Sequence, residues 1–578
     1  MEASHVQDAA GPRVQLHGMG TRFPGRSLLV LCSLAGALEA RAQFSLARGD
    51  STTRRVTAQS TDSLFVALVD GDYARLVVSH PRGLGIHVVR PNGSTLKSFV
   101  EASMEGAHPV AFAAEGAGRY VVVVHNTRDA ALPYDVAFRE RLSLDERTRP
   151  VPWRDSLSSP TIERVRRAIE GHASTTEFWQ TIAATGTPLV EPYDARYDLV
   201  TFLWRGANDT RNVHVNATFE VPDGRNRQLH RVGDSDVWYL TVKMPKGARF
   251  EYQLEPNRPS APDADRVTRQ VDPLNRGPKY ECPAEASTYR CYSIGELPEA
   301  VSQPWLAKRA GVATGSIETK RIHSDIQKVD RDLTIYLPAG YTRSGKRYDL
   351  VVLYDGDDYL GDEWYGRNTW DNLIATGRTP PFVVVMVHNL PGRRLFDLVA
   401  NAAFGDFMAR ELAPFIRAHY HVTADARRTV IGGASAGGFG ATYLGLVHPE
   451  VFGNVLSMSG AFWWSPEHNG GICGGLCATP DGRPAVANRD ATTEPNWVAR
   501  VALERPTIPA RFFITVGTFE FDQVGSGGNI LEETRRLRDI LRAKHGRVIY
   551  QEFVGGHDGL GWRGMLGEGL DRLLGVGH

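Results

Sequence analysis

The chain has 578 residues, which is more than one hydrophobic core usually supports, so we expect several domains. Hydrophobic residues make up 42% and charged residues 23% of it, a composition typical of globular rather than disordered proteins. Lysine plus arginine and aspartate plus glutamate both total 66, so the formal net charge is zero. Nucleic-acid-binding proteins usually carry a basic excess, so this balance argues against nucleic acid as a partner.

A short apolar run near the N-terminus has the features of an export signal. Arg22 and Arg26 precede the run 28–38, and Ala40-Arg41-Ala42 follows it as a small-x-small cleavage site. The run is too short to span a bilayer, so we expect no stable membrane insertion after removal of the signal over 1–42. The pattern predicts a periplasmic or secreted protein, with Met19 as the start because the stretch before it is polar. An ordinary buried helix is the alternative.

Cysteine usage is consistent with export. Four cysteines follow the signal, and they form two couples that are close in sequence: Cys282 with Cys291, and Cys473 with Cys477. An oxidising compartment would let each couple close as a short-loop disulfide. Zinc binding is the alternative, although neither couple has C-x-x-C spacing and His468 is the only nearby histidine. We therefore expect no metal and no cofactor.

Residues 43–140 alternate short apolar strands with turn residues, which is typical of a small β-sandwich. Strands are expected over 63–69, 74–79, 85–90 and 119–125. The segment resembles the bacterial pre-peptidase C-terminal domain, a module carried by many exported enzymes. It contains no candidate catalytic cluster.

A linker and helix are expected over 141–175, followed by an immunoglobulin-like β-sandwich over 176–298. Pro, Arg and Ser are frequent in 141–160, and helical spacing of apolar residues runs from Thr161 to about Ala184. The second sandwich is predicted from strand patterns over 198–204, 212–216, 236–242 and 250–254.

Over 299–578 apolar strands alternate with amphipathic helices. This pattern predicts a mostly parallel sheet covered on both faces, with active-site residues at the carboxyl ends of its strands. The whole chain is therefore expected to be multidomain, with two N-terminal all-β sandwiches followed by an α/β-hydrolase domain. The expected strands are 331–336, 349–354, 382–387, 429–432, 455–458, 511–516 and 548–553, and the expected helices include 404–418, 438–446 and 530–544.

The segment Gly433-Ala-Ser435-Ala-Gly437 matches the nucleophile elbow G-x-S-x-G. A sharp turn from strand to helix strains the serine backbone, so its neighbours must be small. An apolar strand precedes this segment and a helix-forming run follows it, as the elbow requires. Ser435 is therefore the predicted nucleophile of an esterase.

Along the chain, Ser435 should be followed first by the acid and then by the histidine that acts as general base, each after its own strand. His557 comes directly after the last predicted strand, in a glycine-containing loop that can bend over the sheet edge. Glu520 and Asp522 both follow the preceding strand, and either could orient the imidazole. The amide of Ala436, with that of Gly356 or Asp357 after strand 349–354, is the expected oxyanion hole. Asp355-Gly356 could instead form only a turn.

Several segments resemble bacterial enterochelin esterases over residues 176–578. In the catalytic part these are Gly555–Gly564, Ser459–Trp464, Gly433–Gly438 and Arg394–Asn401, and in the sandwich Phe178-Trp179, Gly186–Glu191, Val200–Arg205 and Asp272–Asn275. The resemblance implies hydrolysis of the serine esters of a catecholate siderophore, which carries iron. It favours Glu520 as the acid and implies substrate binding by Arg394, Arg563 and Trp463. A structural ion pair is the alternative for each of the two arginines, in the case of Arg394 with Asp397.

Two departures leave the substrate open. Well-known siderophore esterases of this type are often cytoplasmic, whereas this chain has a signal and an extra leading sandwich. The insertion 469–477 is expected beside the active-site mouth and could reshape the pocket. A feruloyl, acetyl or general acyl esterase acting on carbohydrate-linked or other esters is therefore the second hypothesis. A catalytically inactive binding protein is the third.

Overall fold

The computed structural model divides the chain into two compact units, residues 1–143 and 144–578. The described residues are 44–100, 102, 104–150, 157–219, 227–260, 268–277, 291–361, 363–399, 401–465, 496–521 and 529–575. The predicted signal and the cysteines Cys282, Cys473 and Cys477 lie outside them. Cys291 is disulfide-bonded, and its pairing with Cys282 stays a prediction.

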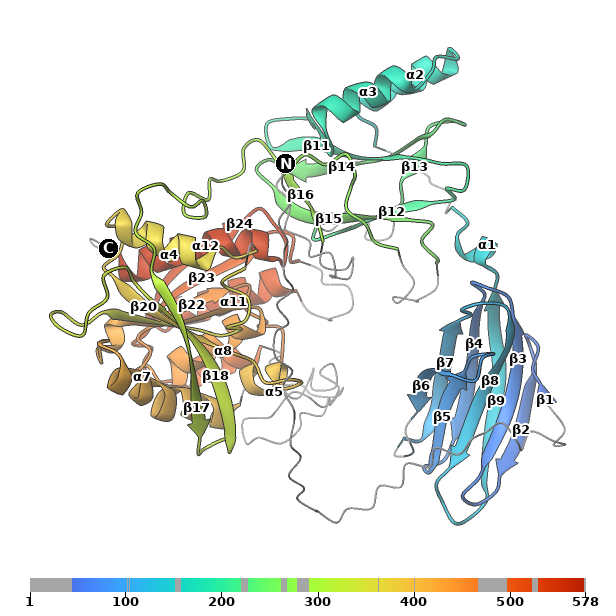
Figure 1. Ribbon diagram of the computed structural model, residues 1–578, viewed down its shortest axis with the longest axis horizontal. Helices are drawn as coiled ribbons and strands as arrows, with labels where there is room; N and C mark the ends of the chain where they lie inside the picture. Colours follow the sequence, from blue (N-terminus) through green and yellow to red (C-terminus); the bar gives the residue numbers. More distant parts are fainter. Residues whose placement is uncertain are drawn as a thin grey trace, which may run out of the picture. The chain divides into compact units, whose positions relative to one another are not determined.

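The first unit is built from two antiparallel-rich sheets, with strand orders β1-β3-β8-β5-β6 and β2-β9-β4-β7 (Figure 1). Alternate side chains along a strand face the same side, and Leu76, Val78, Val122 and Val124 accordingly share one buried core. The strands are β1 Phe44–Ser45, β2 Ser51–Val56, β3 Thr61–Leu68, β4 Tyr73–His80, β5 Leu84–Val89, β6 Thr95–Val100, β7 Gly106–Ala113, β8 Gly118–Asn126 and β9 Leu132–Leu142.

The second unit begins with α1 (Leu144–Arg147), followed by two separate helices, α2 (Pro160–Glu170) and α3 (Thr176–Thr185). The sequence predicted one helical stretch from Thr161 to Ala184, and this is wrong. Gly171 caps α2, and His172 has a φ of 60°, a left-handed conformation that a continuing helix cannot contain. Both helices pack on one sheet of the next domain through a shared apolar cluster that includes Ile162 and Trp179.

That next domain is a second sandwich, called here the immunoglobulin-like domain after the fold predicted for it. Its sheets have the orders β10-β11-β14-β13 and β12-β15-β16. Their facing side chains form an aromatic-rich core around Phe202, Phe219, Phe250 and Tyr252. The strands are β10 Leu189–Pro192, β11 Tyr197–Arg205, β12 Val213–Ala217, β13 His230–Arg231, β14 Val237–Pro245, β15 Arg249–Pro256 and β16 Ser293–Glu296.

The domain that carries Ser435, His557 and Glu520, called here the catalytic domain after the role predicted for these residues, is organised around an eight-stranded sheet with the order β17-β18-β20-β19-β21-β22-β23-β24. The last six strands in this order are parallel to one another, and β17 and β18 form an antiparallel hairpin at one edge. The strands are β17 Ser316–Ser324, β18 Val329–Leu337, β19 Asp349–Leu353, β20 Phe382–Val387, β21 Thr429–Ala434, β22 Asn454–Met458, β23 Arg511–Gly517 and β24 Arg547–Phe553.

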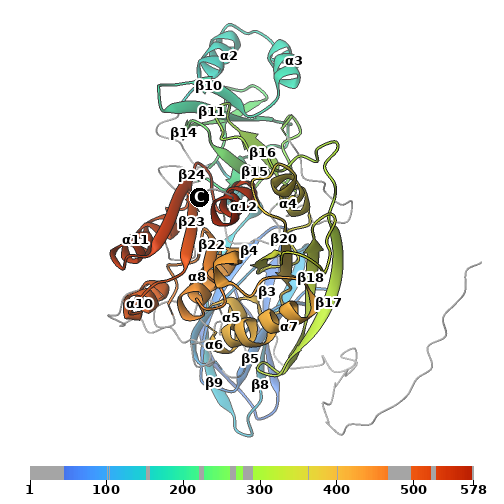
Figure 2. The ribbon, with the colours of Figure 1, turned by 90° about the vertical axis from the view of Figure 1, so that its left-hand side faces the viewer.

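Helices cover both faces of this sheet (Figure 2). Apolar side chains of α4 and α12 form one core with one face, and those of the other large helices form a second core with the opposite face. Among the described residues, none of the helices is long and apolar enough to cross a bilayer. The helices are α4 Gly366–Ala375, α5 Arg394–Leu398, α6 Ala402–Asp406, the π-helical turn Phe407–Leu412, α7 Ala413–His419, the 3-10 turn Ala426–Arg428, α8 Ala436–Val447, α10 Trp497–Glu504, α11 Ile530–Ala543 and α12 Gly559–Leu574.

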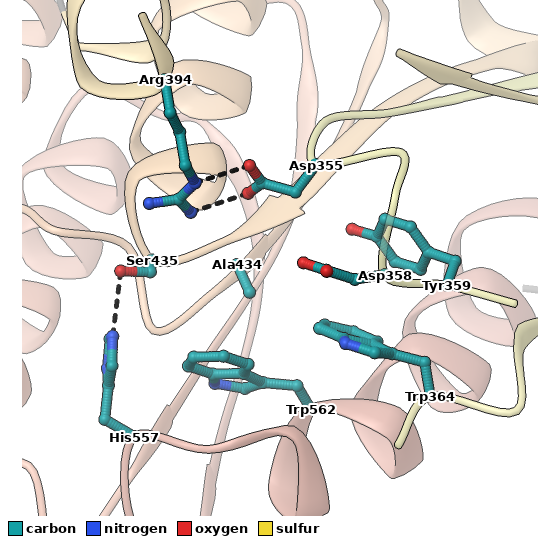
Figure 3. A pocket seen from close by; sticks show the side chains of 9 residues that line it. All are labelled: Asp355, Asp358, Tyr359, Trp364, Arg394, Ala434, Ser435, His557 and Trp562. Carbon is teal, nitrogen blue, oxygen red and sulfur yellow. Dashed lines mark hydrogen bonds and ion pairs between the residues drawn. The ribbon is translucent and has the colours of Figure 1, made fainter. Parts of the chain in front are cut away.

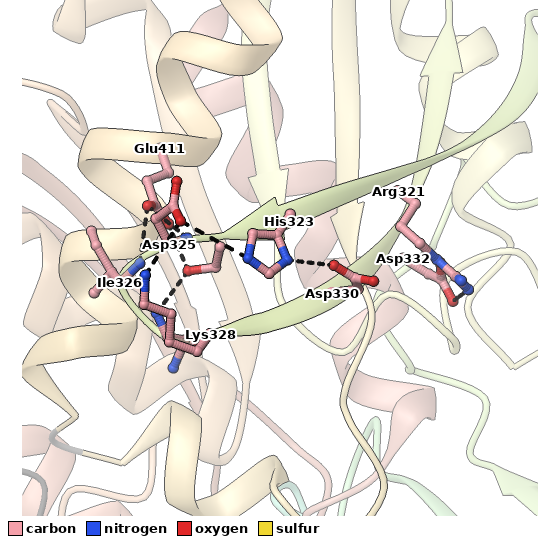
Figure 4. A network of polar contacts seen from close by, with 10 residues as sticks. Arg321, His323, Asp325, Ile326, Lys328, Asp330, Asp332 and Glu411 are labelled. Atoms are coloured by element: carbon pink, nitrogen blue, oxygen red, sulfur yellow. Dashed lines mark hydrogen bonds and ion pairs between the residues drawn. The ribbon is translucent and has the colours of Figure 1, made fainter. Parts of the chain in front are cut away.

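The tip of the β17–β18 hairpin is fastened to the rest of the domain by one carboxylate (Figure 4). Glu411 accepts hydrogen bonds from the Ser324 hydroxyl at 2.6 Å and from the amides of Asp325 and Ile326 at 3.0 and 3.1 Å. Along the hairpin, Arg321 pairs with Asp332 and His323 with Asp330, each directly opposite its partner. Charged side chains of this kind protect an exposed edge strand from pairing with other chains.

A buried ion pair anchors helix α5, which carries Arg394. Arg331 of β18 and Asp397 of α5 are 1% and 2% exposed, and their side chains are 2.6 Å apart. Asp397 also accepts from Arg393 at 3.2 Å. The predicted alternative that Asp397 pairs with Arg394 is therefore wrong.

We expect Asp397→Ala to lower the free energy of unfolding by about 3 kcal/mol, because it leaves the Arg331 guanidinium buried without its carboxylate partner. Urea unfolding followed by tryptophan fluorescence measures this. Asp332→Ala is the matched control, since its ion pair with Arg321 is exposed on both sides and its loss should change the free energy of unfolding little. Equal losses in the two variants would contradict the interpretation.

Candidate active site

Ser435 lies on a strained turn between β21 and α8. Its backbone has φ 56° and ψ −120°, a conformation that side-chain-bearing residues rarely adopt. The turn is possible because its neighbours are small: a Cβ on Gly433 would lie 2.8 Å from the carbonyl carbon of Gly437. The sequence pattern and the geometry agree here, and the serine hydroxyl is presented at the carboxyl end of the sheet.

A continuous hydrogen-bond chain joins Ser435, His557 and Glu520. The Ser435 Oγ is 2.9 Å from Nε2 of His557, and Nδ1 of the same ring is 2.7 Å from Oε2 of Glu520. A carboxylate accepts, so Nδ1 carries the proton and Nε2 is left to accept the serine proton. The structure thus brings together the three residues predicted as nucleophile, base and acid. Asp522, the alternative acid, lies outside the described residues.

Glu520 is fully buried and is held by two further donors. The amide of Gly517 and the hydroxyl of Ser459 donate to its Oε1 at 2.7 and 2.6 Å. The indole N–H of Trp562 in turn donates to the Ser459 hydroxyl at 2.8 Å. An indole N–H can only donate, so the Ser459 proton must point to Glu520. Ser459 therefore connects the acid to a tryptophan of the substrate cavity.

The cavity beside Ser435 has a volume of about 220 Å³ and an aromatic wall (Figure 3). The ring of Trp562 lies edge-on to that of His557 at 4.8 Å and is stacked with Trp364 at 6.0 Å. Tyr359 continues the wall at 4.7 Å from Trp364. The complete lining is Asp355, Asp358, Tyr359, Trp364, Arg394, Ala434, Ser435, His557 and Trp562.

The polar side of the cavity is formed by Arg394 and two aspartates. Nε and Nη2 of Arg394 bind the two carboxylate oxygens of Asp355 at 2.6 and 2.8 Å. Burial lowers the pKa of Arg394, but hydrogen bonding to Asp355 and its charge outweigh this and raise that pKa overall. Arg394 therefore stays charged, and its remaining N–H groups, including both on Nη1, are not used by the Asp355 pair. Together with Asp358, the lining carries two carboxylates and one guanidinium.

The predicted oxyanion hole needs one correction. The amide of Gly356 donates to the carbonyl of Val387 at 2.9 Å, so it is not available to a substrate. Asp357 does not line the cavity, and its carboxylate pairs with His388. Asp355 does line it and, with φ 56°, turns the chain sharply after β19. Within the described chain no acceptor is found for the amides of Asp355 and Ala436, so these are the two candidate donors.

Two residues predicted to bind substrate lie elsewhere. Arg563 is 6% exposed and is enclosed by Gln303, whose oxygen is 3.1 Å from its Nε, and by the ring of Tyr365. It is part of the packing of α12 and does not line the cavity. Trp463 packs against an apolar cluster with Val516 and Ile530, also away from the cavity. Neither side chain lines the described cavity, so the structure gives no support to these two predictions; a family resemblance identifies a residue but does not fix the direction of its side chain.

Most residues of the cavity wall were not predicted from the sequence. Trp562 is separated from His557 by one turn at the start of α12, inside the quoted segment Gly555–Gly564, so a signal for it existed. Trp364 and Tyr359 come from the long connection between β19 and α4, which has no periodic pattern to indicate the direction of its side chains. Ser459 begins the segment Ser459–Trp464, which was singled out in the sequence. Its contact with Glu520 becomes visible only when strands β22 and β23 are paired in the structure.

The arrangement is suited to acyl transfer. It offers a serine nucleophile, an imidazole with an acceptor nitrogen directed at it, a buried carboxylate and two unpaired amides near the reacting position. Within the described part of the chain, no group of three His, Cys, Asp or Glu side chains is placed to hold a metal ion.

Comparison with known proteins gives two family matches in tandem. A family described as "Enterochelin esterase, N-terminal" matches residues 199–306, and one described as "Putative esterase" matches residues 324–573. The first covers most of the immunoglobulin-like domain and the second the catalytic domain.

Individual proteins match over both domains. The iron(III) salmochelin esterase of Escherichia coli O6:H1 (strain CFT073) is 27% identical over 425 residues, covering 70% of this chain and 95% of that protein. The iron(III) enterobactin esterase of Dickeya dadantii (strain 3937) is 27% identical over 429 residues, covering 69% and 92%. The structure of the Shigella flexneri enterobactin esterase, determined in the presence of enterobactin, has a TM-score of 0.52 and 23% identity, covering 69% and 97%. At this identity the structural likeness shows a shared fold.

We expect Ser459→Ala to reduce the turnover of p-nitrophenyl acetate by about tenfold, because it removes a hydrogen bond to a buried carboxylate. Initial rates and the melting temperature should be measured together. Ser457→Ala is the matched control: Ser457 is equally buried at the end of β22, but its hydroxyl donates to the Gly438 carbonyl and not to the acid. Similar rate losses in both variants would show that Ser459 has no particular link to Glu520.

Proposed function

Since this chain belongs to the enterochelin esterase family of carboxylic ester hydrolases, we propose that it hydrolyses the ester bonds of a catecholate siderophore. The curated relatives are named as esterases of iron(III) salmochelin and iron(III) enterobactin. The observation that carries the proposal is the chain Ser435–His557–Glu520 at the edge of a cavity with an aromatic wall. The proposed substrate is a tri-serine lactone of the enterochelin type.

The catalytic domain is assigned as an α/β-hydrolase. Three features support this: six parallel strands flanked by helices, a serine on the turn after β21, and the chain order serine, glutamate, histidine. Ser435, His557 and Glu520 are then the nucleophile, the general base and the acid that orients the base.

The reaction begins when the Ser435 Oγ attacks the ester carbonyl carbon while Nε2 of His557 takes its proton. Glu520 holds the ring in the required tautomer and stabilises the imidazolium. The oxyanion is stabilised by the amides of Ala436 and Asp355. His557 then gives the proton to the departing serine hydroxyl of the substrate, leaving an acyl-enzyme on Ser435. A water molecule activated by His557 hydrolyses this intermediate.

The cavity chemistry suits a catechol ring. Trp562 and Trp364 offer flat apolar surfaces on which an aromatic ring can stack, and the free N–H groups of Arg394 can donate to catechol oxygens. A feruloyl ester of a carbohydrate is the second candidate, because the same wall would bind a feruloyl ring.

Product analysis with both substrates distinguishes these candidates. The protein is incubated with a tri-serine catecholate lactone and, separately, with feruloylated arabinose, and the products are separated by mass. The proposal predicts linear trimer, dimer and monomer of dihydroxybenzoylserine from the lactone and little free ferulate. Release of ferulate with an intact lactone would move the assignment to the second candidate.

We also propose that the protein is exported to the periplasm or medium. The proposal rests on the basic flank, apolar run and cleavage motif within residues 1–42, and the disulfide at Cys291 is consistent with it. N-terminal sequencing of protein recovered from outside the cytoplasm tests this. A mature chain that begins near Gln43 is expected, and retention of residues 19–42 would contradict it.

Ser435→Ala and His557→Ala should each reduce ester hydrolysis by about 10⁴-fold or more, and the double variant should be hardly worse, because the two residues act as a unit. The measurement is kcat on the lactone and on p-nitrophenyl acetate, with circular dichroism to show that the fold is kept. A single variant that retains a tenth of the wild-type rate would remove its residue from the mechanism.

Asp358→Asn should lower KM for the ferric catecholate ester by about threefold to tenfold, because it removes one of two negative charges from a cavity that must accept an anion. KM for the neutral p-nitrophenyl acetate should not change, which makes that ester the internal control. The difference should shrink at high salt, since exposed charges are screened. Equal KM changes on both esters would indicate a change in cavity shape instead.

A further inference from the structure

The immunoglobulin-like and catalytic domains belong to one compact unit, and they meet at the two loops that carry Glu520 and His557. Both views of the ribbon place β15 and β16 beside β24 and α12 (Figures 1 and 2). The loops follow β23 and β24, so they leave the sheet at the edge that faces this domain.

The loop that carries His557 is in backbone contact with the immunoglobulin-like domain. The carbonyl of Val554 accepts a hydrogen bond from the amide of Arg249, the first residue of β15, at 3.0 Å. Gly556 lies so close to the residue after β12 that a Cβ on it would be 1.8 Å from the carbonyl oxygen of Thr218. The residue directly before the base thus has no room for any side chain, and the neighbour that excludes it is backbone of the other domain.

The loop that carries Glu520 reaches into the core of the immunoglobulin-like domain. Phe519 is 8% exposed and belongs to the apolar cluster inside that sandwich, not to a core of the catalytic sheet. Its ring is 6.5 Å from that of Phe219, at an interplanar angle of 69°. Phe219 is itself stacked on Phe202 at 5.6 Å and lies edge-on to Phe250 at 5.1 Å. The position of Phe519, and with it the backbone of Glu520, is therefore set by the packing of another domain.

The two loops are also joined to each other. The amide of Phe519 donates to the carbonyl of Gly555 at 3.0 Å, and the amide of Thr518 donates to that of Phe553 at 2.9 Å. A displacement of either loop is thus transmitted to the other, and the 2.7 Å contact between Glu520 and His557 depends on both.

We propose that the immunoglobulin-like domain is a positioning element of the active site, which holds the acid and the base in register through Thr218, Phe219 and Arg249. The inference rests on the roles assigned to Glu520 and His557 above, but not on the identity of the siderophore. It gives the domain a part in every turnover, including that of esters too small to touch it. Since a misplacement of about 1 Å can cost about a hundredfold in rate, modest changes in this contact should be visible in kcat.

The test compares two phenylalanine-to-leucine changes in the full-length protein. Phe219→Leu alters the ring against Phe519, whereas Phe202→Leu makes the same change at an equally buried position of the same cluster. Of the rings described there, only that of Phe219 lies in contact with Phe519. Phe219→Leu should lower kcat for p-nitrophenyl acetate by about tenfold with little change in KM. Phe202→Leu should reduce the melting temperature to a similar extent and leave kcat within about twofold.

A second variant pair makes the test independent of the aromatic core. Gly556→Ala forces the loop away from Thr218, and Gly171→Ala is its control. Gly171 has φ −83°, and its added Cβ would be 3.4 Å from its nearest neighbour, an ordinary contact. The readout is the rate at which a fluorophosphonate labels Ser435, which needs an activated nucleophile but no siderophore. Gly556→Ala should slow labelling by at least about tenfold, and Gly171→Ala should not.

The outcomes separate this inference from the proposed function. Unchanged kcat and labelling in Phe219→Leu and Gly556→Ala, or equal loss in their controls, would overturn the positioning role. Failure to cleave the catecholate lactone would overturn the substrate assignment while leaving these results intact. Fluorophosphonate labelling that persists in Ser435→Ala would remove the triad on which the inference rests.

Discussion

The active site depends on four side chains that leave four adjacent parallel strands at the same edge of the sheet. Ser435 follows β21, Ser459 follows β22, Glu520 follows β23 and His557 follows β24. Parallel neighbours about 5 Å apart bring these residues within reach of one another, and hydrogen bonds of 2.6 to 2.9 Å complete the chain. Each hydrogen bond forms only if the loops that carry its two residues are held in place. The surrounding structure therefore has to fix the four loops after β21, β22, β23 and β24.

Several sets of contacts hold these loops in place. The strained turn at Ser435 is made possible by small residues on both sides and by the core beneath α8. Among the described residues, no lysine or arginine pairs with the buried Glu520. Its carboxylate accepts from three donors instead: Nδ1 of His557, the Ser459 hydroxyl and the Gly517 amide. Through Ser459 the acid is linked to Trp562, so the wall that would contact substrate and the catalytic residues form one network. The two family matches lie next to each other in the sequence, and the two domains that they cover are in contact at the loops that carry Glu520 and His557.

How much of this could be predicted from the sequence depends on how local each signal is. The elbow at Ser435 and the base His557 were accessible because glycine patterns and an apolar strand before each residue specify the backbone. Strand β17 was missed because an exposed edge strand such as Ser316–Ser324 is mostly polar and lacks alternation. Helix α12 was missed because its many glycines lower its helix propensity, although they allow close packing on the sheet.

The directions of side chains were the least predictable feature. The Arg563 side chain packs against Gln303 and Tyr365, and the Gly356 amide donates to the Val387 carbonyl, because contacts between segments far apart in sequence decide such directions. The pairing of Arg394 with Asp355, rather than with Asp397 three residues away, was decided in the same way. The spacing along the helix suggested Asp397 as the partner of Arg394, but Asp397 pairs with the buried Arg331 instead.

The most direct measurement of the central claim is rapid acid quenching of the protein during turnover of a tri-serine catecholate lactone, followed by peptide mass spectrometry. The account predicts that the peptide containing Ser435 carries the linear tris(dihydroxybenzoylseryl) adduct in the first turnovers, because opening the ring leaves the departing hydroxyl on the same chain, and that the adduct disappears when substrate is exhausted. An adduct on another residue, or lactone cleavage by the Ser435→Ala protein at the wild-type rate, would contradict it.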